Sequence, residues 1–256
     1  MELTVDGHKV FASTGGRLLD AKAPLVVLIH GAGMDHSVWS LQSRYLAHHG
    51  RSVLAVDLPG HGRSGGAALT SIEDLADWVA RLIEAAGFER AALAGHSMGA
   101  LAALETANRH PDRVRALALL GVAERMPVHP DLLALAAAND DKAIAMVIGW
   151  GFATSRGGSA APGLWQVGAG IQLMRATKPG VLGLDLAACD AWRGAPEIRC
   201  PTTLILGSSD RMTPAKAGQA LAARIAGSRV VVLKGSGHMM MVEEPDAVTD
   251  ALAAAL

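Results

Sequence analysis

The pentapeptide Gly95-His96-Ser97-Met98-Gly99 is the stretch whose residue types and spacing most directly suggest chemistry. It follows a short apolar run and precedes a run of helix-forming residues, which predicts a tight turn between a strand and a helix. A serine in such a turn takes backbone angles that cost about 1–3 kcal/mol. A side chain at Gly95 or Gly99 would collide with the neighbouring strand or helix. The pattern therefore predicts a nucleophilic hydroxyl on Ser97, close to a helix N-terminus that favours negative charge.

A serine nucleophile needs a general base, and the base needs a carboxylate that holds its tautomer. Asp210 and His238 each follow a predicted buried strand late in the chain. Because the carboxyl ends of parallel strands meet at one edge of a sheet, we expect Ser97, Asp210 and His238 to converge there. Such a group performs acyl transfer: the hydroxyl attacks a carbonyl, a covalent acyl intermediate forms, and water releases the acyl group. Glu124 also follows a predicted strand and is the alternative acid.

The elements that must position these residues alternate between apolar runs and amphipathic stretches, which predicts a mostly parallel, doubly wound α/β sheet. Asp6-Gly7 lies between two short apolar segments and predicts a hairpin, which gives the sheet an antiparallel N-terminal edge. The predicted strands of the parallel part span residues 25–29, 52–56, 91–95, 114–120, 202–206 and 229–233, and helices are expected at 37–49, 71–86, 98–109, 214–225 and 245–256.

The alternation breaks between residues 123 and 195, where four helix-like segments are separated by glycines and prolines. The simplest account is one core formed by residues 1–122 and 196–256, with 123–195 inserted as a helical lid. At 256 residues the chain is long enough for such a domain with a large core.

The composition excludes several classes of function. Hydrophobic residues make up 50% and charged residues 18% of the chain, which indicates a globular, core-rich protein. The formal net charge of −1, without a basic cluster, gives no basis for nucleic-acid binding. We expect no membrane span and no signal peptide, and interpret the two cysteines as reduced thiols in a cytoplasmic protein. No cofactor or metal is expected, and the oligomeric state, monomer or homodimer, is open.

Five motifs, taken in order, resemble those of the α/β-hydrolase fold family, and the resemblance covers nearly the whole chain outside the insertion. They are His30-Gly31-Ala32-Gly33, residues 57–64 (DLPGHGRS), Gly95–Gly99, Gly207–Pro214, and Gly237-His238 with Glu243 and Pro245. The order of Ser97, Asp210 and His238 along the chain is also the order of that family. The resemblance implies an α/β-hydrolase fold and a serine hydrolase of the carboxylesterase or lactonase kind.

By this resemblance, the oxyanion hole is formed by the backbone N–H groups of Ala32 and Met98. Gly33 is the alternative donor if the loop is turned by one residue. A serine nucleophile excludes the haloalkane dehalogenase and epoxide hydrolase branches, which carry an aspartate at this position. The same resemblance makes Asp57 a structural residue, His30 a residue that fixes its loop, and His96 a residue that packs below the turn.

The insertion and the catalytic loops are rich in methionine and tryptophan, which suit an adaptable apolar pocket. Hydrolysis of a small, rather apolar carboxylic ester is therefore the predicted reaction. An enol-lactonase, a carbon–carbon bond hydrolase and a perhydrolase of the same fold are alternatives, and a non-catalytic ligand receptor is a remote one. Arg125, Arg156, Arg175 and Lys178 are candidates to bind a substrate carboxylate. The predicted pocket residues are Met34, Met126, Met146, Trp150, Trp165, Met174, Met212 and Met239.

Overall fold

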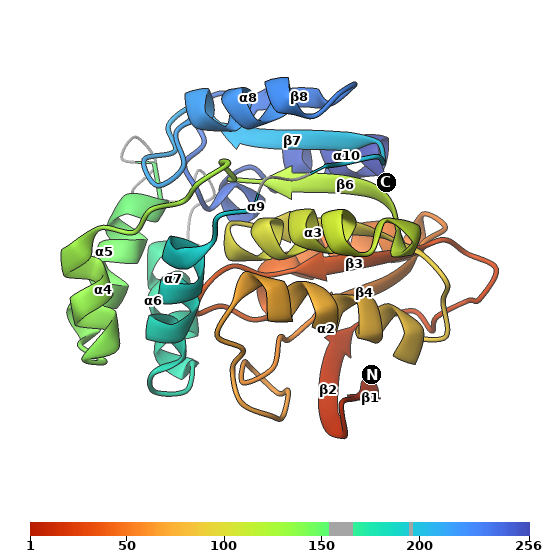
Figure 1. The fold of residues 1–256 in the computed structure, drawn as a ribbon, viewed down its shortest axis with the longest axis horizontal. Helices are drawn as coiled ribbons and strands as arrows, with labels where there is room; N and C mark the ends of the chain where they lie inside the picture. Colours follow the sequence, from red (N-terminus) through yellow and green to blue (C-terminus); the bar gives the residue numbers. More distant parts are fainter. Residues whose placement is uncertain (154–165, 195–196) are drawn as a thin grey trace.

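The structure is a computed structural model that describes residues 1–153, 166–194 and 197–256. Within these residues the chain forms an eight-stranded sheet of order β1-β2-β4-β3-β5-β6-β7-β8 (Figure 1). The strands from β4 to β8 pair in parallel, and β1 and β2 form the antiparallel edge. The strands are β1 (Glu2–Val5), β2 (His8–Ser13), β3 (Leu25–Ile29), β4 (Ser52–Val56), β5 (Ala91–His96), β6 (Val114–Leu120), β7 (Thr202–Gly207) and β8 (Arg229–Leu233).

The predicted hairpin at the N-terminus is confirmed. Val5 pairs with His8, so Asp6 and Gly7 form a two-residue turn. Both turn residues have positive φ, 51° and 76°, the conformation that a tight hairpin turn requires. The fold class predicted from the alternation of apolar runs is confirmed with it.

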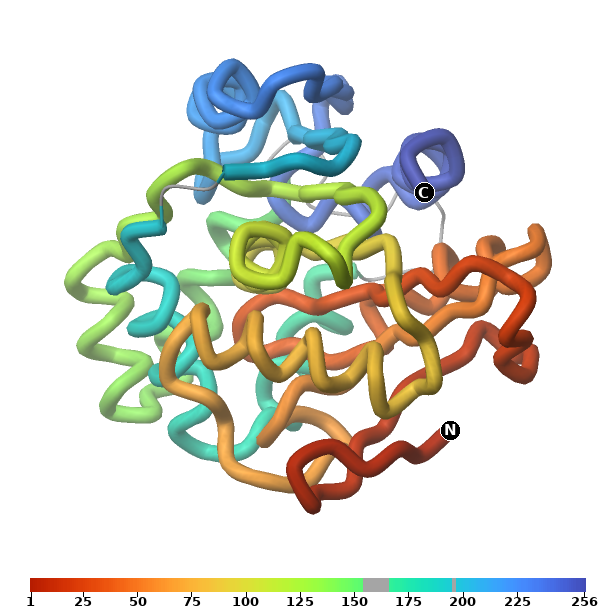
Figure 2. The backbone as a smooth tube through the Cα atoms, turned by 45° about the vertical axis from the view of Figure 1, so that its right-hand side comes forward, coloured from red at the N-terminus to blue at the C-terminus, as the bar shows by residue number. Residues whose placement is uncertain are grey.

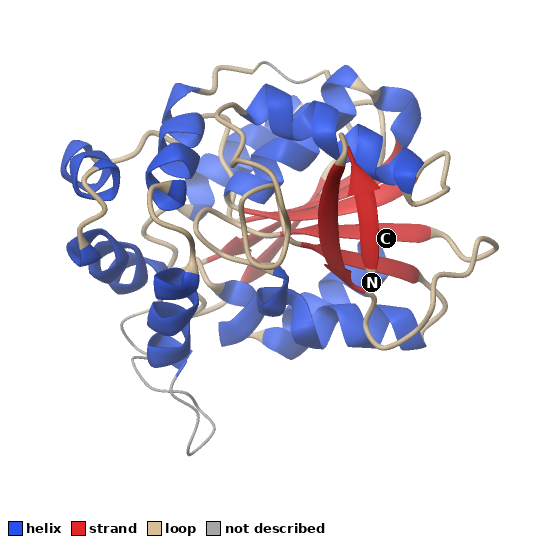
Figure 3. Ribbon diagram, turned by 90° about the horizontal axis from the view of Figure 1, so that it is seen from below, coloured by secondary structure: helices blue, strands red, loops and turns tan. Residues whose placement is uncertain are grey.

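Helices cover both faces of the sheet. The apolar residues of α2 (Ile72–Ala85), α3 (Met98–Arg109) and α8 (Ala215–Arg224) belong to the core on one face, and those of α1 (Ser40–His48) and α10 (Pro245–Ala255) to the core on the other. Figure 3 shows the two layers on either side of the strands. Every residue of β3, β4 and β5 is buried, as a strand covered on both faces requires.

Short helical segments lie beside the longer elements. The 3-10 helix η1 (His36–Trp39) precedes α1, and η2 (Pro111–Arg113) follows α3. Ser71 caps the N-terminus of α2, because its Oγ accepts a hydrogen bond from Asp74 N at 3.0 Å. The short helix α9 (Met240–Glu243) directly after His238 was not predicted.

The helices in the described part of the insertion lie beyond the carboxyl ends of the strands, at one end of the sheet (Figures 1 and 2). They are α4 (Pro130–Ala137), α5 (Asp141–Gly151), α6 (Gln166–Ala176) and α7 (Val181–Ala191). The carboxyl edge of a parallel sheet is where ligands bind in α/β proteins. The inserted helices therefore stand over the edge that carries the candidate site.

No helix among the described residues is long and apolar enough to span a membrane.

Candidate functional site

Ser97 stands in a strained turn between β5 and α3. Its φ of 53° and ψ of −116° are unusual for a residue with a side chain. The glycines on either side of it have no room for a side chain. A Cβ on Gly95 would lie 2.1 Å from Gly99 O, and a Cβ on Gly99 would lie 2.4 Å from Ile29 O. Ser97 N also donates to Leu120 O at 2.9 Å, which ties the turn to β6. The predicted collisions at both glycines are thus confirmed.

Asp210 and His238 form a buried hydrogen-bonded pair on the loops after β7 and β8. His238 Nδ1 lies 2.8 Å from Asp210 Oδ2, and both side chains are buried. Three further bonds fix the carboxylate: the backbone N–H groups of Met212 and Thr213 donate to Oδ1 at 2.8 Å each, and Thr213 Oγ1 donates to Oδ2 at 2.6 Å. Burial raises the pKa of Asp210, but the charge of His238 and the bonds from His238 and Thr213 outweigh it and lower that pKa.

His96 supports the histidine of this pair from below. Its Nε2 lies 2.9 Å from His238 O, and the two rings are 4.7 Å apart. Burial lowers the pKa of His96 to about 3, so the ring is neutral. A neutral ring that donates through Nε2 holds the backbone of the His238 loop without adding a charge next to it. Thr213 and His96 therefore join the site, and sequence reasoning assigned neither of them this contact.

Ser97, His238 and Ala32 line one cavity of about 400 Å³. In the described part of the chain, neither Ser97 Oγ nor His238 Nε2 has a hydrogen-bond partner. Catalytic hydrogen bonds are often long in enzymes without substrate and tighten when it binds. The cavity therefore brings together a hydroxyl and a ring nitrogen that are both available to a ligand.

The loop after β3 runs directly beside Ser97. A Cβ on Gly31 would come within 3.3 Å of Ser97 Cβ, so the peptide between Gly31 and Ala32 lies against the serine. Gly33 N, the alternative donor, already donates to Asp185 Oδ2 at 2.8 Å. Met98 is the first residue of α3, and the first N–H groups of a helix have no partner within it. Of the three N–H groups considered for an oxyanion hole, that of Gly33 is thus already engaged by Asp185.

Four of the predicted pocket residues, Met34, Met126, Trp150 and Met212, line the cavity. Three others do not line it in the described structure. Met174 lines a smaller hollow of about 130 Å³, Met239 is buried in the core, and Met146 packs against the same core cluster. Trp165 lies outside the described residues. The periodicity of a helix shows that it has an apolar face, but not which neighbour that face covers.

The cations that could bind a substrate carboxylate lie elsewhere than expected. Arg211 lines the cavity, and its guanidinium donates to Gly149 O and Phe152 O at the end of α5. Arg175 pairs with Asp141, and Lys178 Nζ lies 3.4 Å from Ser64 O. Arg125 does not line the cavity, and Arg156 lies outside the described residues.

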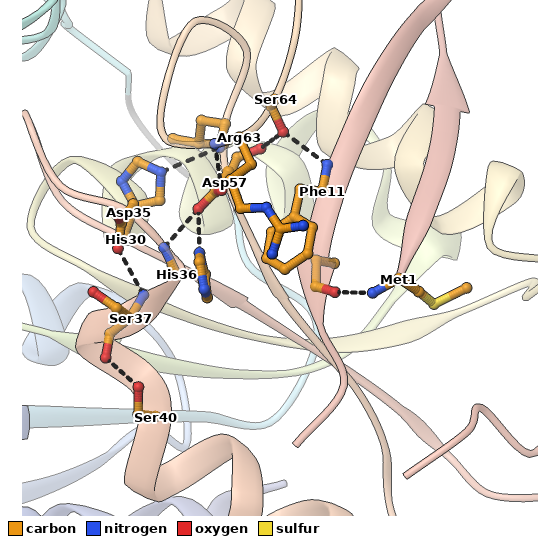
Figure 4. Close-up of polar contacts among 12 residues, drawn as sticks. Met1, Phe11, His30, Asp35, His36, Ser37, Ser40, Asp57, Arg63 and Ser64 are labelled. Atoms are coloured by element: carbon orange, nitrogen blue, oxygen red, sulfur yellow. Dashed lines mark hydrogen bonds and ion pairs between the residues drawn. The ribbon is translucent and has the colours of Figure 1, made fainter. Parts of the chain in front are cut away.

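Asp57 organises a separate polar cluster (Figure 4). It accepts hydrogen bonds from His36 N, from His36 Nδ1 at 2.7 Å, and from Arg63 N at 2.9 Å. The Asp35 carboxylate accepts a hydrogen bond from Ser37 N at 2.8 Å. The side chains of Asp35 and His36 thus stabilise loops and do not line the cavity. Asp57 stabilises the fold.

Glu124, the alternative acid, lies away from His238. Its carboxylate forms an ion pair with Arg224, and the two side chains are 37% and 51% exposed. Of the two acids considered, the structure places Asp210 on the histidine.

A serine on a sharp strand-to-helix turn and a buried aspartate–histidine pair, in the order Ser, Asp, His, define a class of α/β enzymes. The chain matches the model of the alpha/beta hydrolase family over residues 26–251. It belongs to that family.

Known members with different substrates resemble the chain along most of its length. The enol-lactonase from Burkholderia xenovorans LB400 superposes with a TM-score of 0.89 at 27% identity, covering 99% of this chain and 98% of the other. A pimeloyl-[acyl-carrier protein] methyl ester esterase of Aromatoleum aromaticum is 30% identical over 244 residues, which are 87% of this chain and 94% of that protein. An (E)-2-((N-methylformamido)methylene)succinate hydrolase of Acinetobacter baylyi is 28% identical over 90% of this chain and 89% of its own length. The relatives thus include esterases and lactonases.

Proposed function

We propose that the protein is a serine hydrolase that cleaves a small, rather apolar carboxylic ester. The observation that carries the proposal is the convergence of Ser97, the Asp210–His238 pair and the Ala32 loop on one cavity. Its volume of about 400 Å³ lies at the low end of the range of small-molecule sites. Apolar side chains such as Met34, Trp150 and Met212 form much of its wall.

The reaction runs in two halves. Ser97 Oγ attacks the ester carbonyl while His238 Nε2 takes its proton, and Asp210 holds the ring in the required tautomer and stabilises its charged form. The carbonyl oxygen becomes an oxyanion that accepts hydrogen bonds from the N–H groups of Ala32 and Met98. His238 then protonates the leaving alcohol, which leaves an acyl group on Ser97. Water, activated by His238, attacks this acyl-enzyme and releases the acid.

The test is removal of the hydroxyl. Ser97→Ala is expected to abolish hydrolysis of a p-nitrophenyl ester while the far-UV circular dichroism and melting temperature stay near those of the wild type. A fluorophosphonate probe is expected to add one adduct, located on Ser97 by peptide mass spectrometry. Ser43→Ala is the control, because Ser43 is also buried but does not line the cavity. Retained turnover in Ser97→Ala, or an adduct on another residue, would refute the proposal.

A second candidate is an ester or lactone that carries a carboxylate. Arg211 on the cavity wall favours the carboxylate, and the enol-lactonase likeness favours the lactone. Because an exposed charge pair contributes up to about 1 kcal/mol, Arg211→Gln is expected to lower kcat/KM for a carboxylate-bearing ester about fivefold. The same variant is expected to leave a neutral ester of equal length unchanged. An equal loss on both esters would instead assign Arg211 to the packing of α5.

A further inference from the structure

A buried carboxylate of the insertion contacts the loop that carries Ala32. Asp185 lies on α7 and is 2% exposed. Its Oδ2 accepts a hydrogen bond from Gly33 N at 2.8 Å and lies 2.8 Å from His61 Nε2. One oxygen on an inserted helix therefore holds two loops of the core, the loop after β3 and the loop after β4.

His61 faces Asp185 as a cation. Its Nδ1 lies 3.0 Å from Pro59 O and its Nε2 faces the carboxylate, so both ring nitrogens meet acceptors and both must donate. Burial lowers the pKa of His61, but the bond to Asp185 and the charge of that carboxylate outweigh burial and raise it. Buried ion pairs contribute little net stability compared with apolar packing, so this pair calls for another role.

Hydrogen bonds fix the peptides on both sides of Ala32, and Asp185 accepts one of them. Gly33 is held at both ends, because its N–H donates to Asp185 and its C=O accepts from Thr177 Oγ1 at 2.8 Å. On the other side, Gly31 O lies 2.8 Å from His30 Nδ1. The carbonyl of Gly31 and the N–H of Ala32 belong to one planar trans peptide and point in opposite directions. The direction of the Ala32 N–H is therefore set by His30 on one side of Ala32 and by the bond of Gly33 N to Asp185 on the other.

The helix that carries Asp185 also forms a wall of the cavity. Leu182, Leu186 and Cys189 of α7 line the cavity, and they flank Asp185 on the helix. A Cβ on Gly33 would lie 2.9 Å from Leu182 Cδ1, so the loop and the helix are in close contact. A shift of α7 would thus move the cavity wall and the donor loop together.

We propose that Asp185 is a positioning residue for the oxyanion hole: its carboxylate, paired with His61, holds the Gly33 peptide and thereby aims the Ala32 N–H at the reacting carbonyl. The inserted helix α7 completes the catalytic geometry of the core as well as enclosing the substrate. The proposal rests on the proposed function, because it assumes that Ala32 donates to an oxyanion at Ser97.

The test separates transition-state stabilisation from substrate binding. In Asp185→Ala the Gly33 peptide loses its acceptor, and a displaced donor costs rate but not ground-state affinity. We expect kcat to fall about 10- to 100-fold with KM within twofold of the wild type. The inhibition constant of a boronic acid, which forms a tetrahedral adduct with the serine, is expected to rise by the same factor. Asp185→Asn keeps an acceptor oxygen and is expected to recover kcat to within about tenfold of the wild type.

Two further variants keep the test decisive. Asp190→Ala is the matched control, because Asp190 also lies on α7 and its carboxylate accepts a hydrogen bond from a backbone N–H, that of Val128, at 2.9 Å. It is expected to lower the melting temperature without changing kcat. Thr177→Val, which removes the other bond to Gly33, is expected to lower kcat severalfold and serves if Asp185→Ala does not fold.

The outcomes also distinguish the two proposals. An active wild type whose Asp185→Ala and Thr177→Val variants keep the wild-type kcat and boronate affinity would overturn the role of Asp185 alone. A wild type that neither hydrolyses esters nor reacts with the fluorophosphonate would overturn the proposed function itself.

Discussion

Two histidine–aspartate pairs are buried among the residues that the structure describes, and they differ in the surroundings of the second ring nitrogen. His238 with Asp210 and His61 with Asp185 have the same N–O distance of 2.8 Å. The Nδ1 of His61 is engaged by Pro59 O, so this ring can only donate. The Nε2 of His238 has no hydrogen-bond partner among the described residues, and its side chain lines the cavity. The same pair of residues can thus serve structure at one place and proton transfer at another.

The insertion contacts both pairs, but with different chemistry. At His238 it offers a backbone carbonyl: Gly151 O at the end of α5 accepts from His238 N at 2.7 Å and from Met239 N at 3.1 Å. At His61 it offers the charged carboxylate of Asp185. The backbone contact at the first pair therefore brings no charge of the insertion next to His238. The charged contact at the second pair ties the inserted helix to the core.

The largest expected difference between the pairs comes from the same substitution in each. Asp210→Asn is expected to lower kcat by about 10⁴, because an amide stabilises the wrong tautomer of the histidine and cannot balance its charge. Asp185→Asn keeps an acceptor for Gly33 N–H and should cost less than tenfold. Both are measured as kcat on one p-nitrophenyl ester, with Asp190→Asn as the control. Equal losses at 210 and 185 would mean that the two pairs do not differ in role.

The two pairs should also respond to pH with opposite signs. Asp210 has a lowered pKa in the folded protein, so its stabilisation is present above the unfolded pKa of about 3.9 and is lost as the pH falls through the folded pKa. His61 has a raised pKa, so its stabilisation is full below the unfolded pKa of about 6.5 and is lost as the pH rises through the folded pKa. His30 and Asp57 also act on His61 and belong to the same titration.

The pH dependence expected of His61 can be measured as the free energy of unfolding in urea between pH 6 and 9. The wild type is expected to have the larger free energy of unfolding at pH 6, and its difference from His61→Gln is expected to shrink steadily as the pH rises to 9. His48→Gln is the control, since His48 is exposed at the end of α1. An advantage that stays constant from pH 6 to 9 would show that His61 is not charged in the folded protein.

The sequence predicts some of these contacts and not others, depending on how far apart the contacting residues lie in the chain. Ser97, Asp210 and His238 follow strands, and the ends of parallel strands meet at one edge whatever the loops do in detail. Asp185 follows no strand. It lies 152 positions along the chain from Gly33, whose N–H donates a hydrogen bond to it. One signal was available: Asp185 lies between Leu182 and Leu186 on the apolar stripe of α7, and a charged residue in such a stripe is buried with a partner.

The pocket shows a second limit of the sequence. Methionine and tryptophan on the inserted helices predicted an apolar cavity, but composition does not give the rotation of each helix. Trp150 and Met146, four residues apart on α5, both pack against the same core cluster, but only Trp150 also lines the cavity. The fold, the turn at Ser97 and the loops of the acid and base follow from local patterns. The partners of Asp57 and Asp185 come from tertiary packing.

The smallest expected effect concerns Glu124, the alternative acid. Glu124 pairs with Arg224 at the surface, and such pairs contribute about 0–1 kcal/mol. Glu124→Gln is therefore expected to leave kcat unchanged and to lower the free energy of unfolding by no more than about 1 kcal/mol. Arg224→Gln and the double variant close a thermodynamic cycle that isolates the pair. If Glu124→Gln instead lowers kcat a hundredfold, catalysis relies on the Glu124 carboxylate, and the role proposed for Asp210 would be wrong.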